Sequence, residues 1–292
     1  MSRVPLGVSQ QELYVAARRV LLDAGEALAA QRDALILVGA QAVYLRAGDA
    51  DIPVALYTAD ADIGIDRAKL SADPKLEDAM RAAGFELRAS DRVQPGIWVR
   101  SVQVGERTLD IPVDLLIPDQ FSGRKSPRRR SVSIPPHDKM AVRRVDGIEL
   151  ATVDNDPMLI ASLDAADKRS VRMKVAGPAA LLTAKAYKIR DRVADRSPGR
   201  DSDKDAGDVI RLMRVSNIRA VSASFARLLQ HEDRRIAGTA ATGLELLADQ
   251  FGRGRGVGVA MATRTLAGAL PPETIEALAT AFTRGLPSPA RE

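Results

Sequence analysis

The chain has 292 residues, 46% of them hydrophobic, and a formal net charge of +5. The absence of cysteine excludes disulfides and thiolate metal sites, and the presence of only two histidines nearly excludes a multi-histidine zinc site. No apolar run reaches the length of a membrane span, and the N-terminus lacks the apolar segment of a signal peptide, so we expect a cytoplasmic protein without a membrane partner. Because cysteine is absent and histidine is scarce, any metal ion would be held mainly by carboxylates. The net positive charge favours an anionic partner.

The first half of the chain alternates between helical and strand-like patterns. A helix is expected over residues 9–31, where Ser9 and Glu12 form a capping-box pair. The expected elements that follow are a strand at 34–38, a helix from 41 that ends near Gly48, a strand at 55–65, a helix with Asp73 as N-cap and Pro74 in its first turn that ends at Gly84, and strands at 85–88, 96–104 and 108–117, the last two joined by a turn at Gly105 and Glu106.

The pattern changes in the second half. A basic, proline-rich loop is expected at 122–137 and further strands within 147–175. Pro178 begins a predicted helix through residue 193, a second helix starts at Asp205, and the remainder is mostly helical, with a glycine-rich loop at 251–258. The fold class is therefore predicted as α/β (α+β), with a mixed-sheet core in residues 1–176 and a helical C-terminal domain in residues 177–292.

Two aspartates lie close together in the strand predicted at 55–65. Side chains alternate along a strand, so Asp60 and Asp62 are expected on the same side. Like charges side by side repel, and a hard divalent ion such as Mg²⁺ would relieve that repulsion. The sequence therefore predicts a carboxylate site for Mg²⁺.

A third carboxylate is expected from the strand at 108–117, where Asp110 and Asp114 share a face. We favour Asp114, because the apolar residues after it mark a buried strand in which an unpaired charge would be costly. Asp60, Asp62 and Asp114 could then hold two Mg²⁺ ions, which would clamp a nucleotide α-phosphate and stabilise the leaving pyrophosphate. The alternative interpretation is three ordinary surface aspartates on one sheet face.

The turn before the helix at 41 is built from small residues. Gly39 permits a close approach of the backbone to a phosphate oxygen, and Ala40 follows it at a helix start that offers N–H groups. Thr58 could donate a hydroxyl hydrogen bond to a triphosphate, or it could simply be a β-branched strand residue. Phosphate and metal together indicate an NTP site.

The helical half adds charged candidates. Lys185 and Lys188 share a helix face, and either could contact a triphosphate; the alternative is a solvated face. Asp205 and Asp208 open the next helix, where acidic residues also favour the helix dipole.

These motifs, in this order, resemble the AbiEii/MenT nucleotidyltransferase toxins of type IV toxin–antitoxin systems, which are members of the DNA polymerase β-like superfamily. The segments that carry the resemblance span roughly residues 35 to 212 and are Val38-Gly39-Ala40-Gln41-Ala42, Thr58-Ala59-Asp60-Ala61-Asp62, Val113-Asp114-Leu115, Leu182-Thr183-Ala184-Lys185 with Arg192 seven residues on, and Lys204-Asp205-Ala206-Gly207-Asp208. Gly39-Ala40 stands where the family has Gly-Gly or Gly-Ser, and the spacer before Asp205 is long and polar.

The resemblance implies a mixed-sheet nucleotidyltransferase core and transfer of a nucleotide from an NTP, in some relatives to the 3′ acceptor end of tRNA, which blocks translation. It implies metal ligation by Asp60 and Asp62, a triphosphate contact from Lys185 and a further catalytic carboxylate. Asp205 is the residue that the resemblance indicates for that carboxylate, with Asp208 as the alternative that stays open. A cognate antitoxin is a further implied partner.

One run of basic residues is a candidate tRNA-backbone contact, or else a solvated loop. It consists of Arg124, Lys125, Arg128, Arg129 and Arg130. The sequence leaves two other functions open. One is a small-molecule (antibiotic) nucleotidyltransferase, which the basic charge disfavours because cationic drugs prefer acidic pockets. The other is a non-catalytic nucleic-acid-binding module, which the retained aspartates disfavour.

Overall fold

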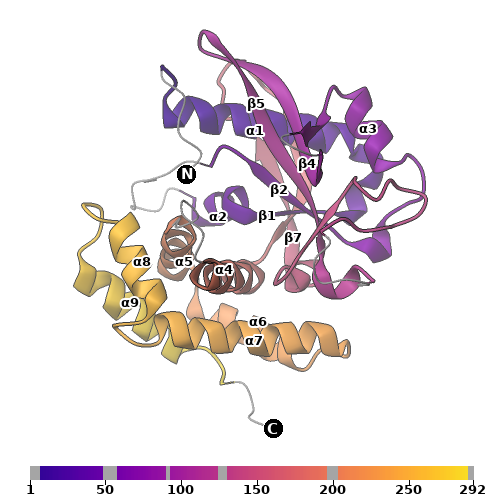
Figure 1. Cartoon of the computed structure of the whole chain (residues 1–292). Helices are drawn as coiled ribbons and strands as arrows, with labels where there is room; N and C mark the ends of the chain where they lie inside the picture. The colour runs from indigo at the N-terminus through magenta and orange to yellow at the C-terminus, as the bar shows by residue number, and fades with distance from the viewer. Residues whose placement is uncertain (1–6, 49–57, 90–92, 124–129, 196–202, 289–292) are drawn as a thin grey trace.

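The protein folds around a mixed eight-stranded sheet, described from a computed structural model at residues 7–48, 58–89, 93–123, 130–195 and 203–288 (Figure 1). The strand order is β3-β4-β5-β2-β1-β8-β7, with β6 beside β5. The strands are β1 (Leu35–Val38), β2 (Ala61–Ile65), β3 (Glu86–Ala89), β4 (Val93–Val104), β5 (Arg107–Pro118), β6 (Arg143–Val145), β7 (Asn155–Ala161) and β8 (Ser170–Ala176). Parallel pairs (β1 with β8, β2 with β5, β5 with β6) occur together with antiparallel ones, which confirms the predicted mixed α/β fold.

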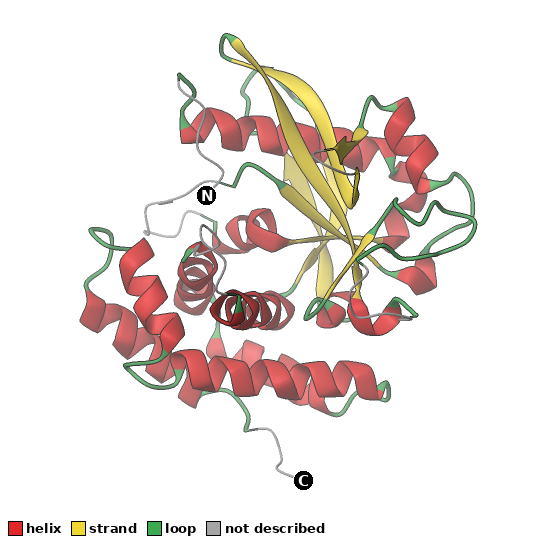
Figure 2. Cartoon of the chain, viewed as in Figure 1, coloured by secondary structure: helices red, strands yellow, loops and turns green. Residues whose placement is uncertain are grey.

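Helices flank this sheet, and the described chain after β8 consists of helices joined by loops (Figure 2). They are α1 (Gln10–Ala27), α2 (Gly39–Ala47), α3 (Leu76–Ala82), α4 (Pro178–Ala194), α5 (Lys204–Val215), α6 (Ile218–Leu229), α7 (Arg234–Phe251), α8 (Val257–Thr265) and α9 (Pro272–Arg284), with short 3₁₀ helices η1 (Ala29–Ala34), η2 (Arg67–Lys69), η3 (Asp119–Phe121) and η4 (Glu149–Thr152). The predicted helical C-terminal region is confirmed. None of the described helices combines the length and the apolar composition needed to span a bilayer.

The helices form two groups around the sheet (Figure 1). Helix α1 packs along the strands, whereas α2, α4 and α5 pack on one another between the sheet and the outer helices α6 to α9. One hydrophobic core runs through both halves: Val175 at the end of β8 and Leu181 in α4 belong to the same buried cluster. The boundary predicted at residue 176 therefore crosses a continuous core.

The middle strands are apolar because helices or neighbouring strands cover them. All four residues of β1 are buried, as expected for a central strand covered on both faces. Where strand β5 extends beyond β2 it has exposed and partly buried residues, with Ile111 buried, and it is buried throughout from Val113 onward, where β2 pairs with it.

Several boundaries differ from the predictions. Helix α1 ends at Ala27 and η1 follows it, α2 begins earlier, at Gly39, and β2 begins only at Ala61. Of the strand predicted at 55–65, only the part from Ala61 is a strand, so Asp60 lies just before β2. Residues 55–57 lie outside the described residues. The short strand β6 falls in a region that the sequence did not identify as a strand.

The predicted cap of α3 is wrong. The helix begins at Leu76, after Lys75 as N-cap, and not at Pro74 after Asp73. A tertiary contact explains this start, because the buried ring of His137 accepts a hydrogen bond from the Leu76 N–H at 3.2 Å. That contact satisfies one of the free N–H groups of the first turn, which a local aspartate cap would otherwise serve.

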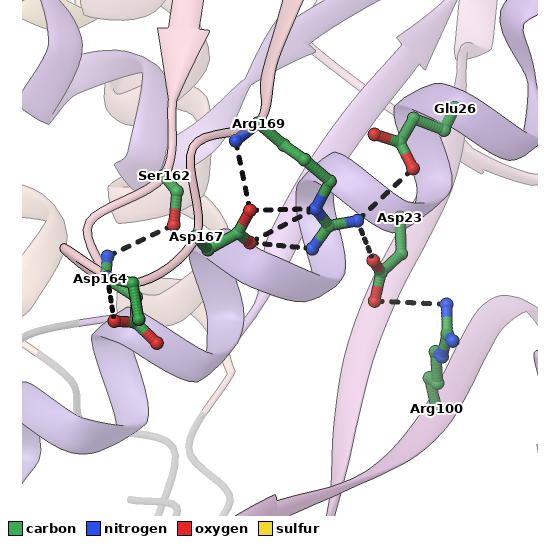
Figure 3. Close-up of polar contacts among 8 residues, drawn as sticks. Asp23, Glu26, Arg100, Ser162, Asp164, Asp167 and Arg169 are labelled. Atoms are coloured by element: carbon green, nitrogen blue, oxygen red, sulfur yellow. Dashed lines mark hydrogen bonds and ion pairs between the residues drawn. The ribbon is translucent and has the colours of Figure 1, made fainter.

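An ion-pair network connects α1 to the sheet (Figure 3). Asp23 in α1 pairs with Arg100 of β4 at 3.0 Å and with Arg169 before β8 at 2.8 Å. Arg169 also pairs with Glu26 and with Asp167. The network joins three elements that are distant in sequence and so fixes α1 against the sheet.

Candidate active site

The turn between β1 and α2 is shaped around Asp62. Gly39, the first residue of α2, has φ +70°, a conformation that favours glycine. A Cβ placed on Gly39 would collide with the Asp62 carboxylate, and Val38 is the antiparallel partner of Asp62. The Asp62 carboxylate therefore lies at the N-terminus of α2, where the helix dipole favours negative charge.

Asp62 and Asp114 face each other across neighbouring parallel strands. They are Cα partners in the pairing of β2 with β5, and both are buried. Burial raises the pKa of Asp114 to about 7. The negative charges of Asp62 and Asp60 add to this shift, and the positive charge of Arg143 opposes it. The two in-register carboxylates thus form a buried cluster of like charge.

Asp60 lies just before β2 and is half-buried. The sequence placed Asp60 beside Asp62 because side chains alternate along a strand. Since Asp60 precedes β2, that argument does not apply to it. The Thr58 hydroxyl donates a hydrogen bond to its carboxylate. Burial disfavours its charge, but Lys204, the Thr58 hydrogen bond and Lys188 outweigh burial and lower the pKa of Asp60.

Cationic side chains surround these carboxylates. Lys188 Nζ of α4 lies 3.9 Å from Asp62 Oδ2, and the lysine side chain is 40% exposed. Arg143 of β6 donates a hydrogen bond to Asp114. Burial lowers the pKa of Lys204, although the charge of Asp60 opposes that shift. Neighbouring cations therefore partly offset the negative charge of the cluster.

Lys185 lies deeper than the solvated helix face that the sequence allowed. Its side chain is 3% exposed, and its Nζ donates to Asp205 Oδ1 and to Asp208 Oδ2, both at 2.7 Å. Burial alone would lower the pKa of Lys185, but these two carboxylates raise it above its ordinary value. The solvated alternative is wrong for this residue. Its role as a triphosphate contact stays a prediction that the buried pairing does not favour.

Asp205 and Asp208 at the start of α5 both bind Lys185, so these contacts do not show which of the two is the further catalytic carboxylate. Asp205 also pairs with Arg192 at 2.7 Å, which brings together a lysine, an arginine and an aspartate of the family-like motifs. Burial opposes its ionisation, but Lys185, Lys188 and Arg192 lower the pKa of Asp205. The question of Asp205 or Asp208 stays open.

The other candidates occupy varied positions. Ala40 is buried in the first turn of α2, and Thr58 is buried beside Asp60. Asp110 lies on the exposed part of β5 beyond β2, where it accepts a hydrogen bond from Ser101 Oγ at 2.6 Å, so it does not join the cluster. In the basic run only Arg130 is described, and Arg124, Lys125, Arg128 and Arg129 lie outside the described residues.

The predicted three-aspartate metal site is not fully assembled. Among the described residues, no three Asp, Glu, His or Cys side chains come close enough together to hold one metal ion. The cluster nevertheless fits Mg²⁺ in a different way, since this ion usually binds one or two carboxylates, substrate phosphates and water rather than a full protein cage. Asp62 supplies one such carboxylate, and Asp60 flanks it on the preceding segment.

Two site residues were not predicted from the sequence. Lys204 belongs to one of the family-like motifs but had no role assigned to it, and its burial beside Asp60 results from the packing of α5. Arg143 had no signal at all, because only the unpredicted pairing of β6 with β5 brings it to Asp114. A hollow of about 250 Å³ between the end of α1 and the start of β8 contains none of the site residues.

Comparisons with known protein families, curated proteins and solved structures give no match to this chain. The functional interpretation therefore depends on the chemistry of the site and on the motif resemblance.

Proposed function

We propose that this chain is a Mg²⁺-dependent nucleotidyltransferase toxin that transfers a nucleotide from an NTP to RNA, foremost to the 3′ acceptor end of tRNA, in the cytoplasm. The observation that carries the proposal is the facing of Asp62 and Asp114 on adjacent parallel strands, beside the N-terminus of α2. A buried pair of carboxylates is costly unless a cation compensates it, and a helix N-terminus suits a phosphate.

Asp60 and Asp62 would hold the Mg²⁺, and its charge there would also offset the repulsion between Asp62 and Asp114. When bound, the ion would neutralise the triphosphate and activate the attacking hydroxyl. The first turn of α2 would offer N–H groups to a phosphate, whereas the space that a Gly39 side chain would fill is taken by the Asp62 carboxylate.

The partly exposed ammonium of Lys188 lies 3.9 Å from Asp62 Oδ2 and would pair with a phosphate oxygen. Asp114, with a pKa of about 7, would accept the proton of the acceptor hydroxyl on its carboxylate. Its bond to Arg143 would hold that carboxylate in place.

RNA is the favoured acceptor because of charge. The chain carries a net +5, and the C-terminal end of its basic run lies beside β6: the Arg130 carbonyl accepts a hydrogen bond from Arg144 N at 2.9 Å, and Ser131 bridges to Arg143. Because Arg143 itself contacts Asp114, an RNA backbone bound at Arg130 would pass close to the carboxylates. The toxin role and a cognate antitoxin come from the motif resemblance.

The test is incubation of the purified protein with total tRNA, Mg²⁺ and each α-³²P-labelled NTP in turn, resolved on a denaturing gel. We expect a labelled tRNA band with wild type, and none with Asp60→Ala or Asp62→Asn. Asp110→Asn is the matched control, since this exposed aspartate of the same sheet lies outside the cluster and its loss should leave labelling unchanged.

Each other outcome has a stated consequence. Near-wild-type labelling by Asp60→Ala would overturn the assignment of the metal site. No tRNA labelling with any NTP, but labelling of an aminoglycoside, would replace RNA with a small-molecule acceptor. Absence of Mg²⁺–NTP binding in calorimetry would leave a non-catalytic binding module.

A further inference from the structure

A buried arginine, Arg18, is connected to Asp60 through one intervening side chain. Arg18 in α1 is 2% exposed, and its guanidinium donates in three directions. Nε donates to Gln41 Oε1 at 2.9 Å, Nη1 to the Ala161 carbonyl of β7 at 3.1 Å, and Nη2 to the Tyr14 hydroxyl at 3.1 Å. These contacts with three different elements fix the orientation of the group.

Gln41 carries this connection to the site. It lies in the first turn of α2, two residues after Gly39, and is 1% exposed. While its Oε1 accepts from Arg18, its Nε2 donates to the Asp60 main-chain carbonyl at 3.1 Å. Asp60 directly precedes β2, so the Gln41 side chain bonds the main chain at the point where the strand begins.

Among the residues that the structure describes, no acid neutralises the charge of Arg18. Its three hydrogen-bond acceptors are an amide, a main-chain carbonyl and a tyrosine hydroxyl. Burial lowers the pKa of Arg18, yet arginine keeps its proton in proteins. A buried charge without a counter-ion is costly, and apolar side chains would fill the same space at lower cost.

The cation has an effect that an apolar residue would lack. A charged donor on Gln41 Oε1 polarises the amide, which strengthens the bond from its Nε2 to Asp60. The chain Arg18–Gln41–Asp60 therefore restrains the main chain at the residue on which the metal site depends.

We propose that Arg18 and Gln41 are positioning residues that hold the Asp60 peptide so that its carboxylate, together with Asp62, binds a divalent cation. The inference rests on the nucleotidyltransferase function proposed above, since the cation has its role there. Neither side chain touches the reacting atoms; both act through Asp60.

The test compares two buried glutamines. Gln41→Met removes both hydrogen bonds and keeps the shape of the side chain. Gln31→Met is the matched control, because Gln31 is also 1% exposed but its Nε2 donates to the Ser71 and Pro74 carbonyls, at 3.0 and 2.7 Å, and to none of the site residues. The measurement is Mn²⁺ binding to the full chain by electron paramagnetic resonance, with thermal melting recorded in parallel.

We expect Gln41→Met to weaken Mn²⁺ binding roughly 10–100-fold, the range seen when a residue that orients a metal ligand is lost. Gln31→Met should bind Mn²⁺ as wild type does, even if both variants melt at similarly reduced temperatures. Arg18→Met should also weaken binding in the wild-type background, but it should cause no further loss in the Gln41→Met background, because a residue acting through Gln41 has no effect once Gln41 is replaced.

Unchanged Mn²⁺ affinity in Gln41→Met, or equal losses in both glutamine variants, would overturn the positioning role. A wild-type chain that binds no Mn²⁺ would overturn it as well. Failure of the proposed function looks different: wild type would label no acceptor with any NTP, while Gln41→Met still weakened Mn²⁺ binding relative to Gln31→Met.

Discussion

The Asp62 carboxylate lies in the space that a side chain on Gly39 would occupy. Gly39 also has a positive φ of +70°, so two separate constraints apply at one position. Backbone strain alone would favour glycine there, and the neighbouring carboxylate adds a steric reason.

We predict that Gly39→Ala displaces Asp62 and abolishes nucleotidyl transfer. The positive φ should cost about 1 kcal/mol of unfolding free energy, measured by urea denaturation, because L residues are strained in that conformation. The new methyl group would in addition move the carboxylate and weaken Mn²⁺ binding.

Gly84→Ala separates these two effects. Gly84 has φ +77°, and a methyl group added to its Cα would meet no atom within 4 Å, so its replacement carries the strain without the collision. It should lose similar stability from strain and keep full Mn²⁺ binding. Equal Mn²⁺ affinity in the two variants would contradict the steric argument.

Lys185 and Lys188 differ in burial, and we predict that they differ in function. Lys185→Met should lower the free energy of unfolding by about 3–5 kcal/mol, because it leaves Asp205 and Asp208 buried without their shared cation. Lys188→Met should change it by only about 0.5 kcal/mol, as for most surface substitutions, and should instead weaken NTP binding.

Urea denaturation and NTP titration of both variants make the comparison. A Lys185→Met protein as stable as wild type would show that the two aspartates do not need this lysine. A Lys188→Met protein with unchanged NTP affinity would remove Lys188 from the phosphate site.

The sheet was predictable from the sequence where local patterns are strong, and the site only in part. The apolar runs before Gly39 and after Asp114 marked β1 and β5, and Pro178 marked the start of α4. Local patterns could not show that Asp62 and Asp114 are Cα partners, because that register depends on the pairing of distant strands.

The misses have tertiary causes. Asp73 does not cap α3; instead the N–H of Leu76 donates a hydrogen bond to His137, which lies 61 residues away in the sequence. The charge of Lys185 favoured a solvated position, and only the packing of α4 against α5 shows that it is buried. Side-chain periodicity describes one element at a time, so contacts between elements lie beyond it.

Glu149 should make stability depend on pH. It is fully buried in η4; one carboxylate oxygen accepts a hydrogen bond from Gln120 N at 3.1 Å, and the other has no hydrogen-bond partner among the described residues. Burial raises the pKa of Glu149 from 4.5 to about 7, although its backbone hydrogen bonds oppose the shift. The folded state therefore binds this proton more tightly than the unfolded state does.

The contribution of this proton to stability is complete below about pH 4.5 and is lost as the pH rises through 7. Glu149→Gln carries no charge at any pH and should be more stable than wild type above pH 7, by about 3 kcal/mol. Urea denaturation from pH 4 to pH 8 measures the difference. Parallel stability curves for the two proteins would contradict the buried titration.

Asp154 caps α4 from outside the helix, and its loss should destabilise the helix that carries both lysines. The N-cap residue Gly177 has no side chain to offer, and Asp154 Oδ2 instead accepts a hydrogen bond from Ala180 N at 2.8 Å. Asp154→Ala should lower the free energy of unfolding by about 1–2 kcal/mol, the usual cost of removing a cap. Asp154→Asn keeps an acceptor oxygen and should recover most of that loss in the same urea titration. If Asn and Ala proved equally destabilising, the carboxylate would act through its charge at the helix N-terminus and not through the hydrogen bond.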